Sequence, residues 1–415
     1  MPSRPRSTSI YVNNPTDILP LTVPKWDVAV SSAALKNNSR IFDTIREIVT
    51  TLCPDITITD VDDLEITQLG GGLTNVLYLV KGHEGKGVVN CLVRVNGSEE
   101  SDILVDRQIE NRVSSYLSKM SLAPIYFGRF QNGRVEEFYT GSSPLSPSKM
   151  HPGDSQLSSP AECNSYCWRI LESMSKMHLL EIPEGVAKTD GEATIWDQMD
   201  EWMRLAEEIY GKNGGKVEEG MGEGVYDKLK ERWGIIKEHL TAEPKTPAEA
   251  FARATVFCHM DCQSLNILTL PSPDSSSGEV YDPHAIKLID FEYSCFNPRA
   301  VDLGNTFCEM CECNDLKPDW DKEYPQGEEA TWIVERYVDF QKPGMREEMG
   351  EGWDEFIEGV RIEIDKHSLL SHYGWCFWSI IQDDVSHIDY DYMLYAKIRW
   401  GGSCWMWDRV MKDVA

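Results

Sequence analysis

The stretch HMDCQSLN, residues 259–266, decides the fold that we assign to this chain. A second short stretch, IDFE, follows at residues 289–292. Apolar and β-branched residues come before each of them, at 254–257 and at 285–289, and this composition predicts a strand in both places. The sequence therefore predicts two polar loops, each held at the end of a strand.

The first loop has the form H-x-D-x-x-x-x-N, which resembles the catalytic loop of phosphotransferases with a kinase-like fold. In those enzymes the Asp orients the substrate hydroxyl and accepts its proton, and the Asn binds magnesium. This resemblance makes Asp261 the candidate catalytic base and Asn266 a candidate magnesium ligand. Asp290 stands where the D-F-G motif of kinases binds the other magnesium ion. We interpret His259 as a structural brace near that metal ligand.

A glycine-rich turn and an arginine in the third predicted strand, both upstream of these loops, fit a nucleotide-binding lobe. Residues 70–75, GGGLTN, predict a tight turn between strands, where backbone amides can approach a phosphate. Arg94 is the basic residue of the third predicted strand, where kinases keep a Lys for the phosphates, and Glu110 on the next predicted helix is placed to pair with it. The predicted nucleotide contacts are Gly71, Gly72, Thr74, Asn75, Arg94 and Glu110.

The order of the predicted elements indicates a bilobal chain. Hydrophobic periodicity predicts three strands, a helix at 102–120 and two further strands, which is the order in the small lobe of a kinase-like fold. Mainly helical patterns follow, with an interrupted helix at 353–382 and a mobile Gly/Glu-rich segment at 211–224. We therefore expect an α+β, bilobal protein-kinase-like fold that binds its nucleotide between the lobes. Its parts are a flexible arm at 1–35, an N-terminal lobe at 36–140 and a helical C-terminal lobe at 141–415.

Composition limits the partners and the location. Of 415 residues 41% are apolar, so the chain can bury a sizeable core, and 68 acidic against 40 basic residues give a net charge of −28. Such a charge disfavours binding to nucleic acid or to an anionic membrane surface. The 12 cysteines show no disulfide framework, and no apolar run is long enough for stable membrane insertion, so we expect a cytoplasmic protein. The mildly basic opening predicts a disordered arm, with a targeting segment as the alternative.

Several further motifs resemble the choline/ethanolamine kinase family. They are GGLTN at 71–75, LVRV at 92–95, DLGNTFCE at 302–309 and SHYGWCFWSIIQ at 371–382. The resemblance extends over about residues 64–400 and covers most of the chain. It implies an enzyme that uses ATP and Mg²⁺ to phosphorylate a small amino alcohol, and it raises the hypothesis of a homodimer.

The resemblance also implies a pocket for the amine. Aromatic faces attract a quaternary ammonium group, whereas a primary ammonium group favours oxygen acceptors. Spacing alone favours a place in the hydrophobic core for Trp375 and Trp378, one helical turn apart, and the resemblance reverses this preference. The implied substrate contacts are Asp261, Glu292, Tyr293, Glu309, Asn314, Trp375, Trp378, Tyr392 and Tyr395.

Asn314 favours ethanolamine as the substrate. Choline-preferring members of the family carry a Tyr five residues after the Glu that ends the DLGNTFCE-like motif, and Asn314 occupies that position here. We expect ATP-dependent phosphorylation of ethanolamine to phosphoethanolamine, the first step of phosphatidylethanolamine synthesis by the CDP-ethanolamine route. A choline kinase or a dual kinase is the alternative. A non-catalytic pseudokinase is disfavoured because Asp261, Asn266 and Asp290 are all present, and the tryptophans at 375 and 378 disfavour an aminoglycoside phosphotransferase.

Overall fold

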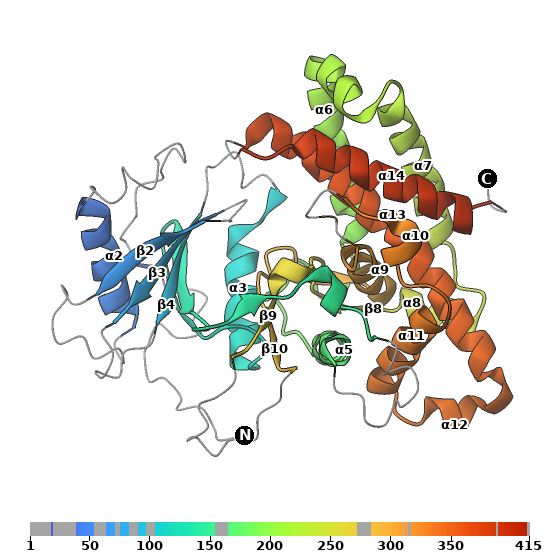
Figure 1. Ribbon diagram of the computed structural model, residues 1–415, viewed down its shortest axis with the longest axis horizontal. Helices are drawn as coiled ribbons and strands as arrows, with labels where there is room; N and C mark the ends of the chain where they lie inside the picture. The colour runs from blue at the N-terminus through green and yellow to red at the C-terminus, as the bar shows by residue number, and fades with distance from the viewer. Residues whose placement is uncertain are drawn as a thin grey trace. The chain divides into compact units, whose positions relative to one another are not determined.

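The computed structural model describes residues 18–19, 39–53, 64–70, 75–82, 90–96, 104–153, 165–271, 284–311, 313, 317–386 and 389–412. The chain divides into two compact units (Figure 1). The N-terminal unit comprises Met1–Ser142 with Ser386–Asp389, and the C-terminal unit comprises Ser143–Val385 with Tyr390–Ala415.

A six-stranded sheet forms the N-terminal unit, in the order β1-β5-β6-β4-β3-β2. Strands β2 to β6 pair antiparallel, and β5 and β6, the two strands predicted after the helix, form a hairpin. The predicted strands upstream of it are likewise confirmed, within a few residues. The strands are β1 (Ile18–Leu19), β2 (Glu65–Leu69), β3 (Asn75–Lys81), β4 (Cys91–Asn96), β5 (Tyr126–Phe130) and β6 (Gly133–Glu137).

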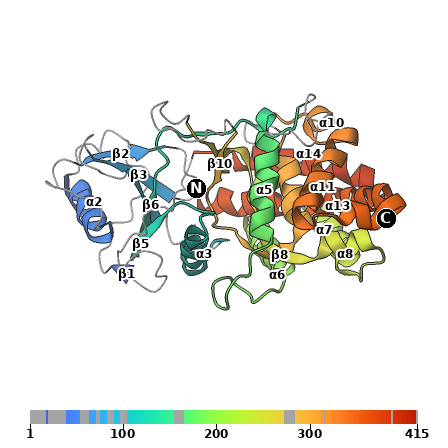
Figure 2. The same ribbon diagram turned by 90° about the horizontal axis from the view of Figure 1, so that it is seen from below.

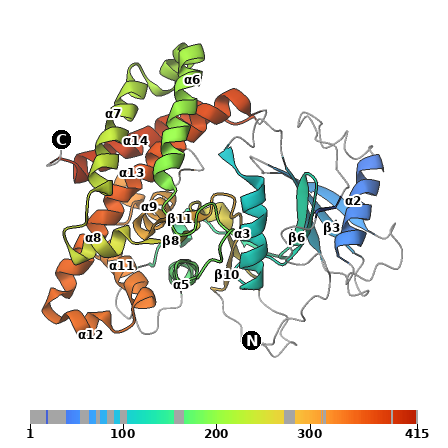
Figure 3. The same ribbon diagram turned by 180° about the vertical axis from the view of Figure 1, so that it is seen from behind.

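Two helices, α2 (Ser39–Leu52) and α3 (Arg107–Lys119), lie on opposite faces of this sheet (Figures 2 and 3). Helix α2 presents an apolar stripe at helical spacing, and this stripe packs on the inward residues of β3 and β4. The buried core formed in this way includes Ile41, Ile45, Ile48, Val49, Leu52, Tyr78, Val80, Val93 and Val95.

Two predictions for this unit need correction. The helix predicted at 102–120 begins only at Arg107, because the Asp106 carboxylate caps it by accepting hydrogen bonds from the backbone N–H groups of Gln108 and Ile109. Within the arm predicted as flexible, Ile18 and Leu19 form β1, which pairs in parallel with β5. A two-residue strand carries too little periodicity to be found in the sequence.

Helices make up most of the C-terminal unit, and the longest, α13, lies at its centre against α14, α9, α6 and α8 (Figure 1). The helices are α5 (Tyr166–His178), α6 (Ile195–Met221), α7 (Val225–Thr241), α8 (Pro247–Arg253), α9 (Arg299–Glu309), α10 (Trp320–Glu323), α11 (Gly327–Gln341), α12 (Met345–Met349), α13 (Trp353–Val385) and α14 (Tyr392–Val410). The unit also contains the short 3₁₀ helices η3 (Pro147–Lys149), η5 (Ser264–Asn266) and η6 (Gly350–Gly352). Among the described helices, none combines the length and the apolar composition that crossing a bilayer requires.

Two helix predictions in this unit were wrong. The segment predicted as mobile at 211–224 is helical as far as Met221, with one non-helical residue at Asn213, because Val217 and Met221 are buried and anchor the last turns. Helix α13 is continuous rather than interrupted, since it is buried along much of its length, and Ser371 at its middle donates a hydrogen bond to Asn305 inside the unit.

Two small sheets carry the polar loops. Strand β8 (Thr255–Cys258) pairs with β11 (Cys295–Pro298), and β9 (Ile267–Thr269) pairs with β10 (Ile286–Leu288) and with β7 (Ser143–Pro144). The strands predicted before the two loops are therefore confirmed as β8 and β10. Residues 272–283, between β9 and β10, lie outside the described residues.

Candidate active site

Hydrogen bonds between its own side chains close the loop that follows β8. Nδ2 of Asn266 donates to Oδ2 of Asp261 over 2.7 Å and to the Asp261 carbonyl oxygen over 2.9 Å. Nε2 of Gln263 donates to the same Oδ2 over 3.1 Å. The Asp261 carboxylate is therefore buried and fixed in direction through one of its two oxygens. The amide nitrogen of Asn266 donates these bonds, and its Oδ1, an acceptor with lone pairs, is the atom with metal-binding chemistry.

His259 links the two polar loops, as predicted. Its Nδ1 lies 3.2 Å from the Asp261 backbone N–H, and its Nε2 lies 3.1 Å from the carbonyl oxygen of Ile289, next to Asp290. Burial lowers the pKa of His259, so the neutral ring accepts at Nδ1 and donates at Nε2. The ring thus acts as a brace between the candidate base and the candidate metal ligand.

Each of the two polar loops contains a residue in a backbone conformation that residues other than glycine rarely adopt. Of the described residues other than glycine, only three have positive φ, and two of these are Met260 (φ 70°) and Asp290 (φ 65°). Such conformations cost about 1–3 kcal/mol each, and they concentrate at functional sites, where surrounding contacts hold them. At Met260 the contacts come from Asp302, whose carboxylate accepts the backbone N–H groups of His259 and Met260 over 2.8 Å each.

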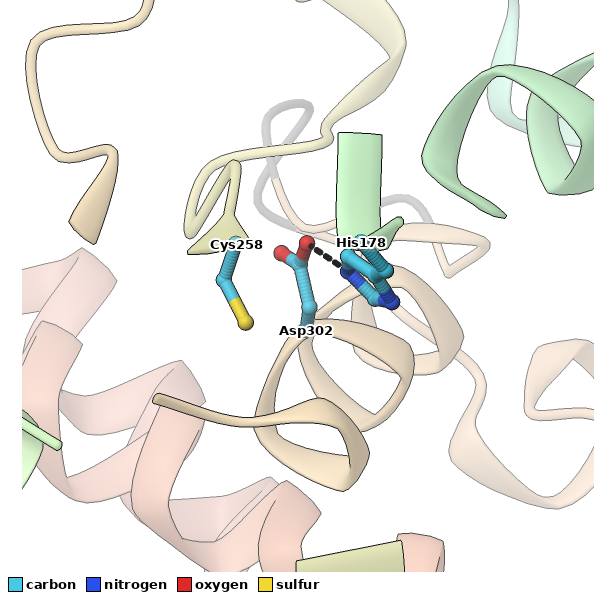
Figure 4. Close-up of side chains that lie close together, drawn as sticks. All are labelled: His178, Cys258 and Asp302. Atoms are coloured by element: carbon cyan, nitrogen blue, oxygen red, sulfur yellow. Dashed lines mark hydrogen bonds and ion pairs between the residues drawn. The ribbon is translucent and has the colours of Figure 1, made fainter. Parts of the chain in front are cut away.

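Asp302 is itself held by buried partners from other helices. Nε2 of His178, at the end of α5, donates to Asp302 over 2.9 Å (Figure 4), and the His178 Nδ1 lies 2.5 Å from the hydroxyl of Tyr337. Burial alone would raise the pKa of Asp302, but the hydrogen bond and charge of His178 lower it below its usual range. Gly304 lets α9 approach α13 closely, since a Cβ there would lie 2.8 Å from the backbone nitrogen of Ser368.

The cluster of His178, Cys258 and Asp302 has the atoms for a metal site, but its bonding disfavours one (Figure 4). Both ring nitrogens of His178 are already engaged, by Asp302 and Tyr337. Burial raises the pKa of the Cys258 thiol well above its usual range, whereas a metal ligand must be a thiolate. We interpret the cluster as support for the loop.

Asp261 lies among other acids of the C-terminal unit. Burial, and then the negative charge of Glu309, raise the pKa of Asp261 well above its usual range. The hydrogen bond from Gln263 opposes this, and the charges of Asp290 and Glu292 add to it. Oxygen ligands in such a cluster fit a hard divalent cation, which would offset their repulsion.

The N-terminal unit holds Arg94 and Glu110 in a buried ionic network. Arg94 lies 3.4 Å from Oε1 of Glu136, and Glu136 also pairs with Arg134 over 2.8 Å. Glu110 pairs with Arg134 and, over 2.9 Å, with Arg107. Glu136 and Arg134 thus link Arg94 to Glu110 through ion pairs, and the charge of Arg94 also helps to lower the pKa of Glu110. Arg134 lies opposite Arg94 on β6, a cross-strand register that the sequence did not provide.

The other predicted nucleotide contacts lie mostly beyond what the structure describes. Gly71, Gly72 and Thr74 fall outside the described residues, as does the predicted substrate contact Asn314. Asn75 is the first residue of β3 and is buried.

The structure brings the predicted aromatic residues together. The Tyr293 ring lies edge-on to Trp375 at 5.7 Å between centroids, and Nε1 of Trp378 donates to the Tyr293 hydroxyl over 2.9 Å. Trp378 contacts both Trp375 and Tyr392, and Tyr390 contacts both Tyr392 and Tyr395. Most of these rings are buried, while Trp375 is half-buried and lines a pocket with Tyr293, Met260, Asn305 and Ser371.

Comparison with known proteins agrees with this geometry. A sequence profile described as choline/ethanolamine kinase matches residues 66–402. The chain belongs to the choline/ethanolamine kinase family. Family membership makes it a phosphotransferase, and kinases of this kind use ATP and a divalent metal ion.

Some relatives of the chain are named choline kinases and others ethanolamine kinases. The chain is 30% identical to "Probable choline kinase 2" of Arabidopsis thaliana, over 82% of its own length and 85% of the relative. It is also 30% identical to "Probable ethanolamine kinase A" of Dictyostelium discoideum, over 81% and 84%. A choline kinase from Cryptosporidium parvum has a similar structure, with a TM-score of 0.67 at 22% identity over 90% and 96% of the two chains. This likeness confirms the protein-kinase-like fold.

Sequence reasoning missed three buried residues around the site of this kinase. Asp302 and His178 hold the loop, and Arg399 on α14 pairs with Glu309 over 2.7 Å. The sequence signal that could have identified them is a charged residue on an otherwise apolar helix face. Asp302 follows Val301 in a buried stretch, and Arg399 stands four residues after Tyr395 on the same face of α14.

Proposed function

We propose that this kinase transfers the γ-phosphoryl group of ATP to the hydroxyl of ethanolamine, with choline as the alternative substrate. The observation that carries the proposal is the fixed, buried carboxylate of Asp261. Asn266 and Gln263 hold its Oδ2, which leaves Oδ1 to receive the substrate hydroxyl. A carboxylate with a raised pKa is a stronger base, so it is suited to accept the hydroxyl proton during transfer.

Asn266 and Asp290 would hold Mg²⁺ through their side-chain oxygens. When bound, the ion would supply positive charge that offsets the negative charge of the phosphates during transfer. His259 braces the loop of the base against the loop of Asp290, because it contacts the backbone at Asp261 and at Ile289. In the N-terminal unit, Arg94 and the backbone of residues 71–75 stay the predicted contacts of the ATP phosphates.

The amine would bind beside the loop, among acids and aromatic rings. Glu309 and Glu292 supply negative charge, and both act electrostatically on Asp261. Tyr293, Trp375, Trp378, Tyr392 and Tyr395 supply the aromatic surface. Aromatic faces attract an ammonium group by about 0.5–2 kcal/mol, depending on desolvation. Acids and rings together suit a small cationic alcohol.

Asn314 remains the reason to prefer ethanolamine. An asparagine offers a carbonyl oxygen to a primary ammonium group, whereas a tyrosine at the same position would offer an aromatic face to a trimethylammonium group. The relatives named above include both choline and ethanolamine kinases, so their names do not decide between the two substrates.

Side-by-side measurement of kcat/KM for ethanolamine and choline, with ATP and Mg²⁺, tests the proposal. We expect the larger value for ethanolamine in the wild type, and a ratio that moves toward choline in Asn314→Tyr. A ratio that is unchanged by this substitution would reject Asn314 as the determinant. Absence of turnover with either amine would reject the proposed function.

A cytoplasmic location and a homodimer are further proposals. The cysteines that the structure describes are all free thiols, which suits a reducing compartment. Size-exclusion chromatography with light scattering measures the mass in solution, and a mass of one chain would reject the dimer.

A further inference from the structure

A fully buried arginine joins three helices at the predicted amine pocket. Arg399 on α14 is 0% exposed. Its Nη1 donates to Oε1 of Glu309, the last residue of α9, over 2.7 Å. Its Nη2 donates to Oγ of Ser371 on α13 over 2.6 Å. One guanidinium therefore connects the helices that supply the acid and the aromatic residues of the pocket.

The hydrogen bonds continue from Arg399 to a tryptophan of the pocket. Ser371 accepts from Arg399 and donates to Oδ1 of Asn305 over 2.7 Å. Nε1 of Trp375 donates to the same Oδ1 over 3.1 Å. The direction of the indole of Trp375 is therefore set, through two polar side chains, by the position of the guanidinium.

Arg399 also faces the aromatic side of the pocket. Its Cζ lies 5.9 Å from the centroid of the buried Tyr395 ring, within the range of a cation–π contact. The planar fork of Arg lets one side chain hold an acid, a hydroxyl and a ring in fixed directions at once. A lysine provides a single point charge and does not reproduce this geometry.

The pairing limits how Glu309 can act. Oε1 is engaged by Arg399, so Oε2 is the oxygen that can meet an ammonium group. A buried carboxylate without a cation is costly, and the guanidinium offsets that cost while fixing the direction of the second oxygen. Glu309 can then offer the substrate one directed acceptor.

We propose that Arg399 is a positioning residue for the amine substrate, which aims Glu309 directly and Trp375 through Ser371 and Asn305. The inference rests on the proposed function, because it deepens the role of the same pocket. The hydrogen bonds described for Arg399 go to Glu309 and Ser371, and not to Asp261 or Asp290. We therefore expect its substitution to affect amine binding more than phosphoryl transfer.

Two substitutions and one control test the proposal. Arg399→Lys keeps the charge but loses the fork, and we expect KM for ethanolamine to rise about tenfold, the effect of one charged hydrogen bond. We expect kcat and the KM for ATP to change by less than about threefold. Ser371→Ala cuts the link to Asn305 and should raise the same KM by about threefold. The control, Ser403→Ala, removes a buried hydroxyl on α14 that donates only to the Trp400 carbonyl, and its KM values should match the wild type.

The double variant Arg399→Lys/Ser371→Ala separates positioning from packing. If the two residues act as one unit, its KM should rise less than the product of the single effects. Unchanged KM for ethanolamine in both single variants, or equal changes in the KM for ATP, would overturn the role of Arg399 while the proposed function stands. If Arg399→Lys fails to fold, Ser371→Ala alone decides, since it removes a single hydroxyl. A wild type without turnover for either amine would overturn the proposed function itself, and the inference with it.

Discussion

The two units bury carboxylates in opposite electrostatic surroundings. In the N-terminal unit, burial alone would raise the pKa of Glu110, but the charges of Arg134, Arg107 and Arg94 lower it to about 2. In the C-terminal unit, burial and neighbouring acids raise the pKa of Asp261 well above its usual range. Glu110 is thus neutralised within its own unit, whereas Asp261 is surrounded by charge of its own sign.

This difference separates an acid that stabilises the fold from one that prepares chemistry. An internal ion pair resists being broken, because removal of one partner leaves the other buried and unpaired. An acid held beside other acids gains from the arrival of cations, here a metal ion and an ammonium group. We expect substitutions to affect stability in the first case and turnover in the second.

The largest effect is expected for Asp261→Asn. Loss of the base should lower kcat by about 1,000-fold or more. The melting temperature should not fall, because the change removes a carboxylate that burial destabilises. Steady-state kinetics and thermal unfolding of the same preparation measure both quantities. The control is Asp197→Asn, an exposed acid in the first turn of α6, which should keep wild-type turnover. Turnover near wild type in Asp261→Asn would remove it as the base.

Glu110→Gln should behave in the opposite way and mainly reduce stability. It leaves Arg107 and Arg134 without their shared carboxylate, and we expect a loss of about 3 kcal/mol in the free energy of unfolding. Asp43→Asn breaks an exposed pair with Arg46 in the same unit and should cost less than about 1 kcal/mol. Denaturant titrations measure the free energy of unfolding of both variants and of the wild type. Equal losses would contradict the structural role of the network.

Acid should weaken the N-terminal network over a defined pH range. The pKa of Glu110 is about 2 in the folded unit and near 4.5 in an unfolded chain, so its ionised form stabilises the fold. The stabilisation is fully present above about pH 4.5 and is lost as the pH falls toward 2. The difference in unfolding free energy between the wild type and Glu110→Gln should therefore shrink across this range. A constant difference from pH 6 to pH 2.5 would exclude Glu110 as its source.

The smallest effect is expected at Asp302. Its electrostatic surroundings are intermediate between those of Glu110 and Asp261, because neutral backbone N–H groups and His178 donate hydrogen bonds to its carboxylate. Asp302→Asn should lower kcat by roughly tenfold to a hundredfold, since the backbone at Met260 loses a charged acceptor. His178→Gln removes one supporting bond and should cost less. A larger loss in His178→Gln than in Asp302→Asn would mean that the histidine acts independently of the loop.

Local signals predicted the framework of the site well. The loop at 259–266 and the strands β8 and β10 follow from composition, and the contact of His259 near Asp290 follows from the motif. The network around Glu110 was not predictable in detail, because Arg134 reaches it only through the register between β4 and β6. Arg399 and His178 act across 90 and 124 positions of sequence, and no local pattern reports such pairings.

The most direct test of the account is ³¹P NMR of a reaction that contains the protein, ATP, Mg²⁺ and ethanolamine. We predict that a phosphomonoester signal of phosphoethanolamine and the signals of ADP appear in equal amounts, and that Asp261→Asn produces neither. Formation of ADP without the phosphomonoester, or a product that forms equally well in Asp261→Asn, would contradict the account.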